Sequence, residues 1–196
     1  TQTESDAKNF ITLDADPNKV HVVGNLKFDV SQLNSNKEVP SEFNLLSNTS
    51  RRVLIAASTR KGEEEKVLNA FRFVLEKVPS AILILVPRHP ERFAEVAKLV
   101  SDLGFKFLRR SEGEESDDSI QVYLGDSMGE LLTYYRFADV AFVGGSLVDT
   151  GCQNVLEPAA LGLPILVGPS QYNFVEICSE LEKASALKTV NSTEEL

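Results

Sequence analysis

Hydroxyls, arginine and histidine stand directly after apolar runs of this sequence, where they could bind a phosphate. Ser58 and Thr59 follow one apolar run, and Arg88 and His89 follow the next. An arginine can hold a phosphate through two parallel hydrogen bonds, and hydroxyls and helix-start amides supply further donors. The ordinary alternatives are hydroxyl and histidine helix caps, and a salt bridge from Arg88 to a neighbouring carboxylate.

A third apolar run ends in a segment that combines a hydroxyl, a glycine and a carboxylate. Ser127 and Glu130 have the S-x-x-E spacing of a capping box, in which each side chain accepts from a backbone N–H at a helix start. Gly129 would then let a ligand approach the amides of Met128 and Gly129 closely. The simpler interpretation is a capped helix without a ligand.

The fourth such segment, 144–157, is rich in glycine and carries a carboxylate at the start of a predicted helix. Gly145 belongs to a Gly-Gly pair, which indicates unusual backbone angles or a closely approaching ligand. Asn154 and Glu157 again have capping-box-like spacing, and Pro158 places the helix start nearby because proline fits only the first turn. Glu157 could accept both hydroxyls of a ribose, or serve as a plain cap residue.

Apolar runs alternate with amphipathic segments from residue 51 onward. Such alternation predicts right-handed βαβ units, that is, an α/β fold with a Rossmann-like parallel sheet and helices on both faces. The expected strands are 52–58, 81–87, 105–110, 120–125, 139–146, 163–169 and 185–190, and the expected helices are 62–78, 90–104, 127–138, 154–162 and 173–184.

The four polar segments all follow predicted strands, and in such sheets ligands bind beyond the carboxyl ends of the strands. Each segment alone is a weak signal. Their convergence at one edge predicts a pocket that clamps a phosphorylated ribonucleoside through backbone amides, one arginine and one glutamate. Neither a GxGxxG nor a Walker sequence is present, which disfavours dinucleotide and ATP sites.

The first fifty residues differ from the rest of the chain. We expect a short buried strand at Val20–Gly24 and a linker or surface excursion at 31–50, which is rich in serine and asparagine. We therefore divide the chain into a strand and linker region, 1–50, and a Rossmann-like domain, 51–196. Because the first residue is Thr1, we expect an excised fragment or a processed protein.

The overall charge disfavours nucleic acid as a partner, because the net charge is -9 and the pI about 4.8. Cys152 and Cys178 lack the spacing of a zinc site, and we expect both to be reduced and in or near a core. The longest apolar run, 81–86, is too short to cross a bilayer, and the polar N-terminal residues do not form a signal peptide.

Several segments together resemble the Kdo transferase family of lipopolysaccharide biosynthesis, whose members transfer 3-deoxy-D-manno-octulosonic acid (Kdo). They occur in that family's order and spacing, over about residues 20–196, which correspond to the C-terminal half of those enzymes. The motif E-P-x-x-x-G alone would indicate only a GT-B glycosyltransferase. The segments are GNLKFD (24–29), AASTRKGEEE (56–65), LVPRHPERF (85–93), GDSMGEL (125–131), ADVAFVGGSLV (138–148) and NVLEPAALGLPILVGP (154–169).

The resemblance implies the C-terminal domain of a GT-B enzyme that moves Kdo from CMP-Kdo to a lipid A precursor (lipid IVA) with inversion, without cofactor or metal. The N-terminal half, absent from this sequence, would bind the lipid A precursor, meet the inner-membrane surface and supply a carboxylate base. This chain would then bind CMP-Kdo, be inactive alone and be soluble, whereas the parent protein would act at the cytoplasmic face of the inner membrane.

The resemblance also implies roles for individual residues. Ser58 and Arg88 would lie near the phosphate, and the backbone of Met128 and Gly129 would contact the nucleotide. GNLKFD would begin the interdomain crossing. Asn154 and Glu157 would hold the sugar and ribose, and they complete a donor-binding set of Ser58, Thr59, Arg88, His89, Ser127, Met128, Gly129, Gly145, Asn154 and Glu157.

One position departs from the family pattern. The family's usual G-G-H-N is Gly151-Cys152-Gln153-Asn154 here. Gln153 can hydrogen-bond but cannot titrate near neutral pH, which argues against proton transfer at this position and leaves sugar binding possible. Two other functions stay open: a UDP-sugar-using GT-B transferase or UDP-sugar 2-epimerase, and a non-catalytic α/β interaction module.

Overall fold

The structure is a computed structural model that describes all residues except 3, 25–45, 47–50 and 114–118. It divides into two compact units, Thr1–Asn34 and Ser35–Leu196, which we describe separately. Most of the GNLKFD segment and of the predicted linker lies outside the described residues.

The first unit contains helix α1, Glu4–Thr12, and a short 3-10 helix η1, Pro17–Lys19. The side chain of Asp16 accepts a hydrogen bond from the Asn18 N–H at 3.0 Å and so caps η1. The strand predicted at Val20–Gly24 is not formed, and that prediction is wrong. A strand needs a neighbouring strand to pair with, but among the described residues this segment bonds instead to the single residue Thr1, through the His21 carbonyl at 2.8 Å and the Val23 N–H at 3.0 Å. Val23 remains 81% exposed, so the segment is not buried either.

The second unit is built on a parallel sheet that confirms the predicted fold class. All pairings between neighbouring strands are parallel, and their order is β3-β4-β2-β1-β5-β6-β7. Strands β1 and β2 are almost continuously buried, as expected for apolar runs covered on both faces. The strands are β1 Val53–Thr59, β2 Ile82–Pro87, β3 Phe107–Arg109, β4 Val122–Leu124, β5 Val140–Val143, β6 Ile165–Val167 and β7 Leu187–Thr189.

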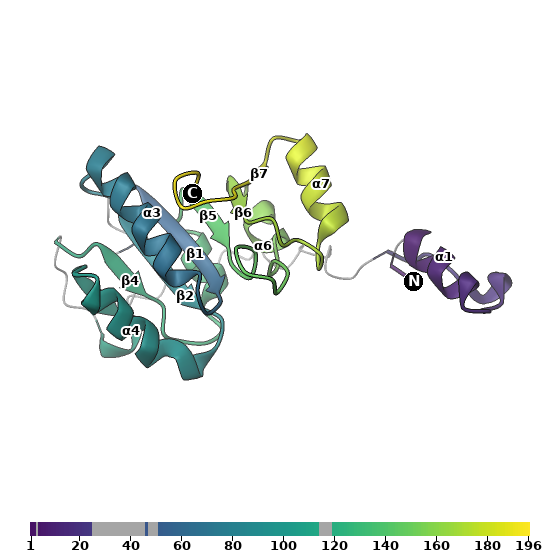
Figure 1. The fold of residues 1–196 in the computed structure, drawn as a ribbon, viewed down its shortest axis with the longest axis horizontal. Coiled ribbons are helices and arrows are strands. Elements are labelled where there is room, and N and C mark those ends of the chain that lie inside the picture. Colours follow the sequence, from purple (N-terminus) through teal and green to yellow (C-terminus); the bar gives the residue numbers. More distant parts are fainter. Residues whose placement is uncertain (3, 25–45, 47–50, 114–118) are drawn as a thin grey trace. The chain divides into compact units, whose positions relative to one another are not determined.

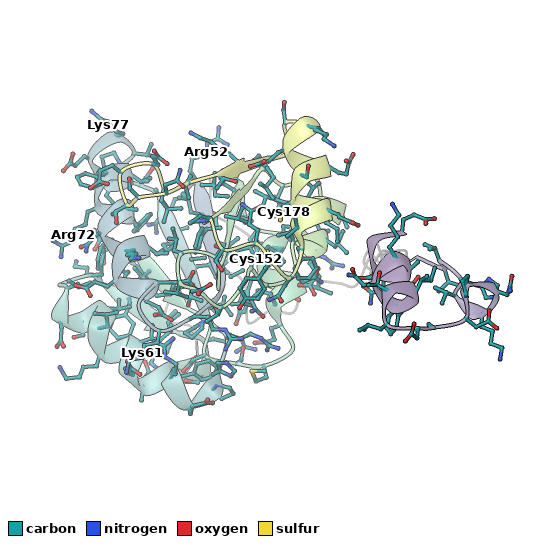
Figure 2. The ribbon with its side chains drawn as sticks, turned by 45° about the vertical axis from the view of Figure 1, so that its right-hand side comes forward. Arg52, Lys61, Arg72, Lys77, Cys152 and Cys178 are labelled. Carbon is teal, nitrogen blue, oxygen red and sulfur yellow. The ribbon has the colours of Figure 1, made fainter. Side chains whose placement is uncertain are left out.

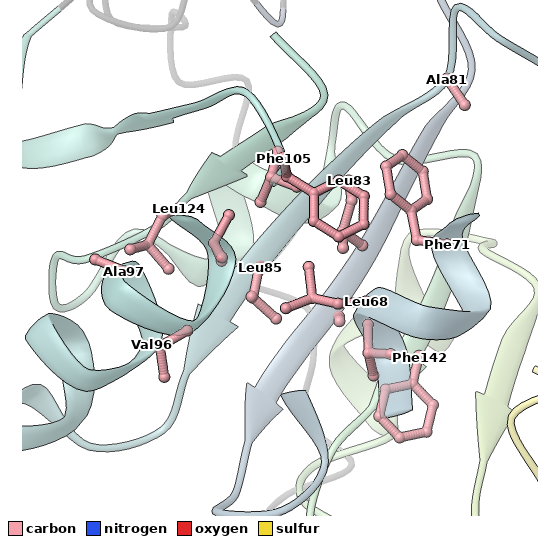
Figure 3. Close-up of a cluster of buried hydrophobic side chains, with 14 residues drawn as sticks. Leu68, Phe71, Ala81, Leu83, Leu85, Val96, Ala97, Phe105, Leu124 and Phe142 are labelled. Atoms are coloured by element: carbon pink, nitrogen blue, oxygen red, sulfur yellow. The ribbon is translucent and has the colours of Figure 1, made fainter. Parts of the chain in front are cut away.

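Helices α3, Glu64–Lys77, and α4, Phe93–Asp102, cover one face of the sheet (Figure 1). Their apolar residues recur at helical spacing, so each helix buries one stripe. Figure 3 shows Leu68 and Phe71 of α3 against Leu83 and Leu85 of β2. Successive residues of a strand point to opposite faces of the sheet, so the alternate residues of each strand face the other side.

The opposite face is covered by α5, Leu131–Tyr135, α6, Leu156–Ala160, and α7, Val175–Lys183. Tyr134 is fully buried there, with its ring edge-on to the ring of Tyr123 at 6.1 Å between centroids. Cys152 and Cys178 are both fully buried as free thiols, with their sulfurs 3.9 Å apart (Figure 2), which confirms the prediction of reduced core cysteines.

Most helices begin later than the sequence predicts. The helix predicted at 90–104 starts with the 3-10 helix η5, Pro90–Arg92, before α4, and the helix predicted at 127–138 is reduced to α5. A further 3-10 helix, η6, Arg110–Glu112, follows β3. The residues that were assigned to helix starts therefore lie in loops at the carboxyl edge of the sheet. Within the part of the chain that the structure describes, no helix is long and apolar enough to cross a membrane.

Candidate functional site

The strand order brings the predicted site residues to one edge of the sheet. The strands β4, β2, β1 and β5 are consecutive neighbours, and each of the four polar segments follows one of them. Because all four strands run in the same direction, their following loops lie side by side. The four polar segments therefore meet at one edge of the sheet, as the sequence predicted. The contacts within these loops determine which groups are available to a ligand.

The end of β1 is an irregular turn that presents Ser58 and encloses Thr59. The pairing register shifts between Ala57 and Thr59, and Ser58 has a φ of 55°. Positive φ in a residue other than glycine costs about 1–2 kcal/mol, so surrounding contacts must hold this turn. The Thr59 hydroxyl is fully buried and has no hydrogen-bond partner among the described atoms. Neither hydroxyl caps α3, so the hydroxyl-cap alternative is wrong.

Arg88, at the end of β2, connects the loops that follow β1 and β5. Its N–H donates to the Thr59 carbonyl at 3.0 Å, and its Nε donates to Oε1 of Gln153 at 3.3 Å. Its side chain is exposed and forms no salt bridge within the described residues, so the salt-bridge alternative fails. Its two Nη groups stay available for an anion.

His89 does not cap the following helix and instead contacts Arg60. Its Nε2 lies 2.5 Å from Nη1 of Arg60, and no side-chain bond to the η5 amides is present. Because the guanidinium can only donate, Nε2 must accept, and the His89 proton is then on Nδ1. The histidine-cap alternative is therefore wrong, and His89 belongs to the wall between the first two loops.

The loop after β4 is held by a network around Glu130. Arg110 donates to both carboxylate oxygens of Glu130 at 3.0 and 3.1 Å, and Ser127 and Tyr134 also donate to Glu130. Partial burial raises the pKa of Glu130, but the hydrogen bonds from Ser127 and Arg110 hold it below its ordinary value. Helix α5 starts only at Leu131, with no side-chain cap, so the predicted capping box is wrong.

Met128 and Gly129 form the tip of this loop. Met128 is 59% exposed, and Gly129 has a φ of 81° with open space around it. Their amides precede α5 and are not the amides of its first turn, contrary to the expectation of a capped helix start. The loop itself is fixed at its base by Asp126, which accepts from Arg109 at 2.9 Å and from the Ser111 N–H at 2.8 Å.

The glycines after β5 allow close contact between loops. A Cβ added at Gly144 would lie 2.6 Å from the Ser58 carbonyl oxygen, so only glycine fits against the end of β1. Gly145 has a φ of 77°, and its N–H donates to the carboxylate of Glu63 at 2.7 Å. Any contact of Gly145 with a ligand would therefore come from its carbonyl or Cα.

Asn154 and Glu157 lie together at the start of α6. Asn154 accepts from the Leu156 N–H at 3.1 Å and donates to Oε1 of Glu157 at 3.0 Å. Glu157 thus pairs with a side chain and does not cap an amide, so the plain-cap alternative is wrong. Burial raises the pKa of Glu157, and the Asn154 bond and the charge of Arg88 oppose that rise. Pro158 lies in the first turn of α6, as predicted.

The comparisons with known proteins identify the family. No protein-family model matches the chain. The chain is 43% identical over 195 residues to the 3-deoxy-D-manno-octulosonic acid transferase of Haemophilus influenzae. It also matches the crystal structure of the C-terminal CMP-Kdo binding domain of WaaA from Acinetobacter baumannii, with a TM-score of 0.73 and 36% identity over 87% of this chain and 85% of that chain.

The chain belongs to the Kdo transferase family. The match to the Haemophilus protein covers 98% of this chain but only 45% of that protein. The chain therefore spans about half the length of the relatives that it matches. A UDP-GlcNAc 2-epimerase from Neisseria meningitidis, bound to UDP-GlcNAc, aligns with 98% of the chain and 48% of the epimerase at a TM-score of 0.56 and 20% identity. That likeness shows a shared fold alone.

Sequence reasoning missed the buried carboxylates of this Kdo transferase family member. Glu63 accepts backbone N–H groups from two loops, and Glu64 forms a bidentate ion pair with Arg92. Both lie in the GEEE run, which was assigned to the exposed start of a helix. The available signal was their position directly after a strand, but nothing in the sequence distinguishes them from the exposed Glu65.

Proposed function

We propose that this chain is the donor-binding half of a Kdo transferase and that the loops at the carboxyl edge of β4, β2, β1 and β5 bind CMP-Kdo. The proposal rests above all on one observation, the link from Arg88 to the loop that carries Gln153, Asn154 and Glu157. Because of that link, the guanidinium of Arg88, which has no ion pair among the described residues, lies near Glu157, a carboxylate that could bind ribose hydroxyls. The family relationship supports the choice of donor, because the Acinetobacter domain is described as a CMP-Kdo binding domain.

Within this proposal the cationic side chains receive the donor phosphate. Arg88 offers its Nη groups, and Lys61 is an exposed cation in the neighbouring loop with no ion pair among the described residues. Glu157 accepts the ribose hydroxyls. Gln153 fixes the plane of the Arg88 guanidinium through Nε, which leaves the phosphate-facing edge oriented.

The reaction we propose is an inverting transfer. An acceptor hydroxyl attacks the anomeric carbon of Kdo, the bond from that carbon to the CMP phosphate oxygen breaks, and CMP leaves with both bonding electrons. Negative charge grows on the phosphate as that bond breaks, so Arg88 would stabilise the transition state more than the ground state. The base that takes the hydroxyl proton belongs to the half of the enzyme that this chain does not span.

We also propose the acceptor and the cellular site for the whole enzyme. Its acceptor is a lipid A precursor, and it acts at the cytoplasmic face of the inner membrane. The name of the Haemophilus relative supports the transferred sugar and leaves the acceptor implied. In this division of labour the present chain binds CMP-Kdo and transfers nothing alone.

An NMR titration of the ¹⁵N-labelled chain with CMP and, separately, with UMP tests the donor. We expect CMP to shift the amides around Arg88, Met128 and Glu157 at millimolar concentration or below. Stronger shifts with UMP would favour a UDP-sugar enzyme instead. No shift near these residues with either nucleotide would favour an α/β interaction module.

Two arginine variants separate a local contact from the overall charge. Arg88→Met should weaken CMP binding roughly 10- to 150-fold, because a hydrogen bond to a charged group contributes about 1.5–3 kcal/mol. Arg52→Met removes the same charge at the amino end of β1 (Figure 2), where Arg52 is 72% exposed and pairs with Asp139. It should leave CMP affinity unchanged. Equal effects of both substitutions would contradict a phosphate contact by Arg88.

A further inference from the structure

Glu63 is a fully buried carboxylate whose partners among the described residues are all backbone amides. Its exposed fraction is 0%, and it lies just before α3. Oε2 accepts from the N–H of Arg60 at 2.8 Å and from that of Gly145 at 2.7 Å, whereas Oε1 accepts from Ser146 at 3.0 Å and from Leu147 at 2.8 Å. Three consecutive amides after β5 therefore close around one carboxylate whose residue follows β1.

Successive backbone N–H groups of this kind form a concave anion-binding nest. If the nest were unoccupied, these amides could bind a phosphate at the end of the strand. Here the side chain of Glu63 fills the nest from within the protein, so these amides already have an acceptor. Their function is then to hold two loops together, and a donor phosphate must find its partners elsewhere.

The loop that Glu63 holds is the loop that carries the donor-facing side chains. Gly144 N–H donates to Ala57 at 2.8 Å, and the Gly144 carbonyl accepts from the Gln153 N–H at 2.9 Å. The hydroxyl of Thr150 donates to the Gly145 carbonyl at 3.1 Å, which closes the loop on itself. A shift of the nest would therefore move Gln153, which is the side-chain partner of Arg88.

We propose that Glu63 is a positioning residue for CMP binding: its carboxylate fixes the loop after β5 against the loop after β1, so that Gln153, Asn154 and Glu157 face Arg88. This inference rests on the proposed function, because it concerns the same loops and the same ligand. Glu63 itself does not touch the donor. Because its carboxylate orders the two loops before the ligand arrives, less conformational entropy is lost on binding.

Glu63→Gln tests the role of the carboxylate with almost no change in shape. A glutamine presents one accepting oxygen and one donating NH₂ group, so two of the four backbone N–H groups would face a donor. We expect CMP affinity, measured by calorimetry on this chain, to fall at least tenfold. Glu65→Gln removes the same charge from the exposed first turn of α3 and should leave CMP affinity within twofold of wild type.

Two further variants distinguish positioning from general stability. Glu63→Asp keeps the charge but is one methylene too short to reach both loops, so its CMP affinity should lie between wild type and Glu63→Gln. Val100→Ala creates a cavity in the core under α4, where Val100 is 0% exposed, and should lower the melting temperature with unchanged CMP affinity. Hydrogen exchange should be slow at Gly145, Ser146 and Leu147 in wild type and faster in both Glu63 variants.

The outcomes separate this inference from the proposed function. If wild type binds CMP and a folded Glu63→Gln chain binds equally well, Glu63 does not position the site. The inference also fails if Val100→Ala loses as much affinity as the Glu63 variants. If Glu63→Gln does not fold, the comparison of Glu63→Asp with Val100→Ala decides the question. A wild-type chain that binds no CMP overturns the proposed function itself, and this inference with it.

Discussion

The buried ion pair between Arg92 and Glu64 allows a quantitative test of how the loop after β2 is held. Arg92 Nη1 lies 2.5 Å from Glu64 Oε1 and Nη2 lies 3.1 Å from Oε2, with side-chain exposures of 13% and 1%. The hydrogen bond to Glu64 raises the pKa of Arg92, so the guanidinium stays protonated despite its burial. The pair connects the start of α3 to the end of η5, which directly follows Arg88 and His89.

Arg92→Met removes the cation and keeps an apolar stem. Glu64 would then be an almost inaccessible carboxylate with no basic partner within ion-pair distance in the described part of the chain. Breaking a buried pair in this way costs about 3–5 kcal/mol. At roughly 2–4 °C per kcal/mol for a chain of this size, the melting temperature should fall by roughly 6–20 °C.

The reverse change should cost less, because Arg92 keeps a second partner. In Glu64→Gln the guanidinium would still lie 3.6 Å from Glu95 and can tilt toward water. We therefore expect Glu64→Gln to lose about 3 kcal/mol or less. Because apolar replacement of a whole buried pair is often neutral, Arg92→Met combined with Glu64→Leu should recover most of the loss of Arg92→Met.

Urea unfolding followed by far-UV circular dichroism measures these differences, since the chain has no tryptophan. Lys98→Met is the control: it breaks the Lys98–Asp102 pair, whose side chains are 75% and 58% exposed, and should cost about 0.5 kcal/mol or less. If Arg92→Met costs no more than Lys98→Met at an unchanged urea slope, the pair does not hold this loop.

Other consequences concern Glu157, Gly144 and the two cysteines. Burial raises the pKa of Glu157 above its ordinary 4.5, so the native state binds that proton more tightly than the unfolded chain and the resulting stability is lost as pH rises through the raised pKa. As pH rises from about 4.5, the free energy of unfolding of Glu157→Gln should therefore increase relative to that of wild type, while the variant binds CMP more weakly. A difference in unfolding free energy, measured by urea unfolding, that stays constant with pH would contradict this. Gly144→Ala should cost about 1–3 kcal/mol in thermal unfolding and weaken CMP binding, because its Cβ would lie 2.6 Å from backbone atoms of Ser58 and Thr59; a neutral substitution would mean that the two loops can separate freely. Cys152 and Cys178 are both 0% exposed, so a disulfide reagent should react with them only in denaturant, and rapid modification of the native chain would show an opening of the α7 side.

The sheet and its helices could be predicted because their information is local. Apolar runs and helical periodicity gave every strand from β1 to β7 and every helix from α3 to α7, with errors mainly at helix starts. The error at Glu130 has a clear cause: Arg110, twenty residues earlier, takes the carboxylate that a capping box would use. The error at Val20–Gly24 has another cause: an apolar run becomes a strand only where a neighbouring strand pairs with it, and the run itself does not show whether such a neighbour exists.

The candidate site could be predicted only in part. The residues that we propose face the ligand have types that indicate binding: Arg88 directly follows β2, and Glu157 lies at the start of α6 beside Pro158. The residues that hold the loops were missed because their partners are distant in sequence: Glu63 binds amides 82 to 84 residues away, and Glu64 pairs with a residue 28 away. A glutamate that accepts backbone amides has no sequence signature that separates it from an exposed one.

The buried polar side chains bear on how so acidic a protein would bind the proposed anionic donor. Within the described residues they are Thr59, Glu63, Glu64, Asp126 and Ser146, and all lie at the carboxyl edge of the sheet. Each of the three carboxylates is matched: Glu63 by backbone amides, Glu64 by Arg92 and Asp126 by Arg109. These contacts hold the loops in place and offset the negative charges, so the carboxylates should repel an anionic ligand little. Arg88 and Lys61, in contrast, have no ion pair among the described residues and stay available for a phosphate. The net charge of -9 is thus a poor guide to this edge of the sheet, where the electrostatic field depends on which charges are already paired.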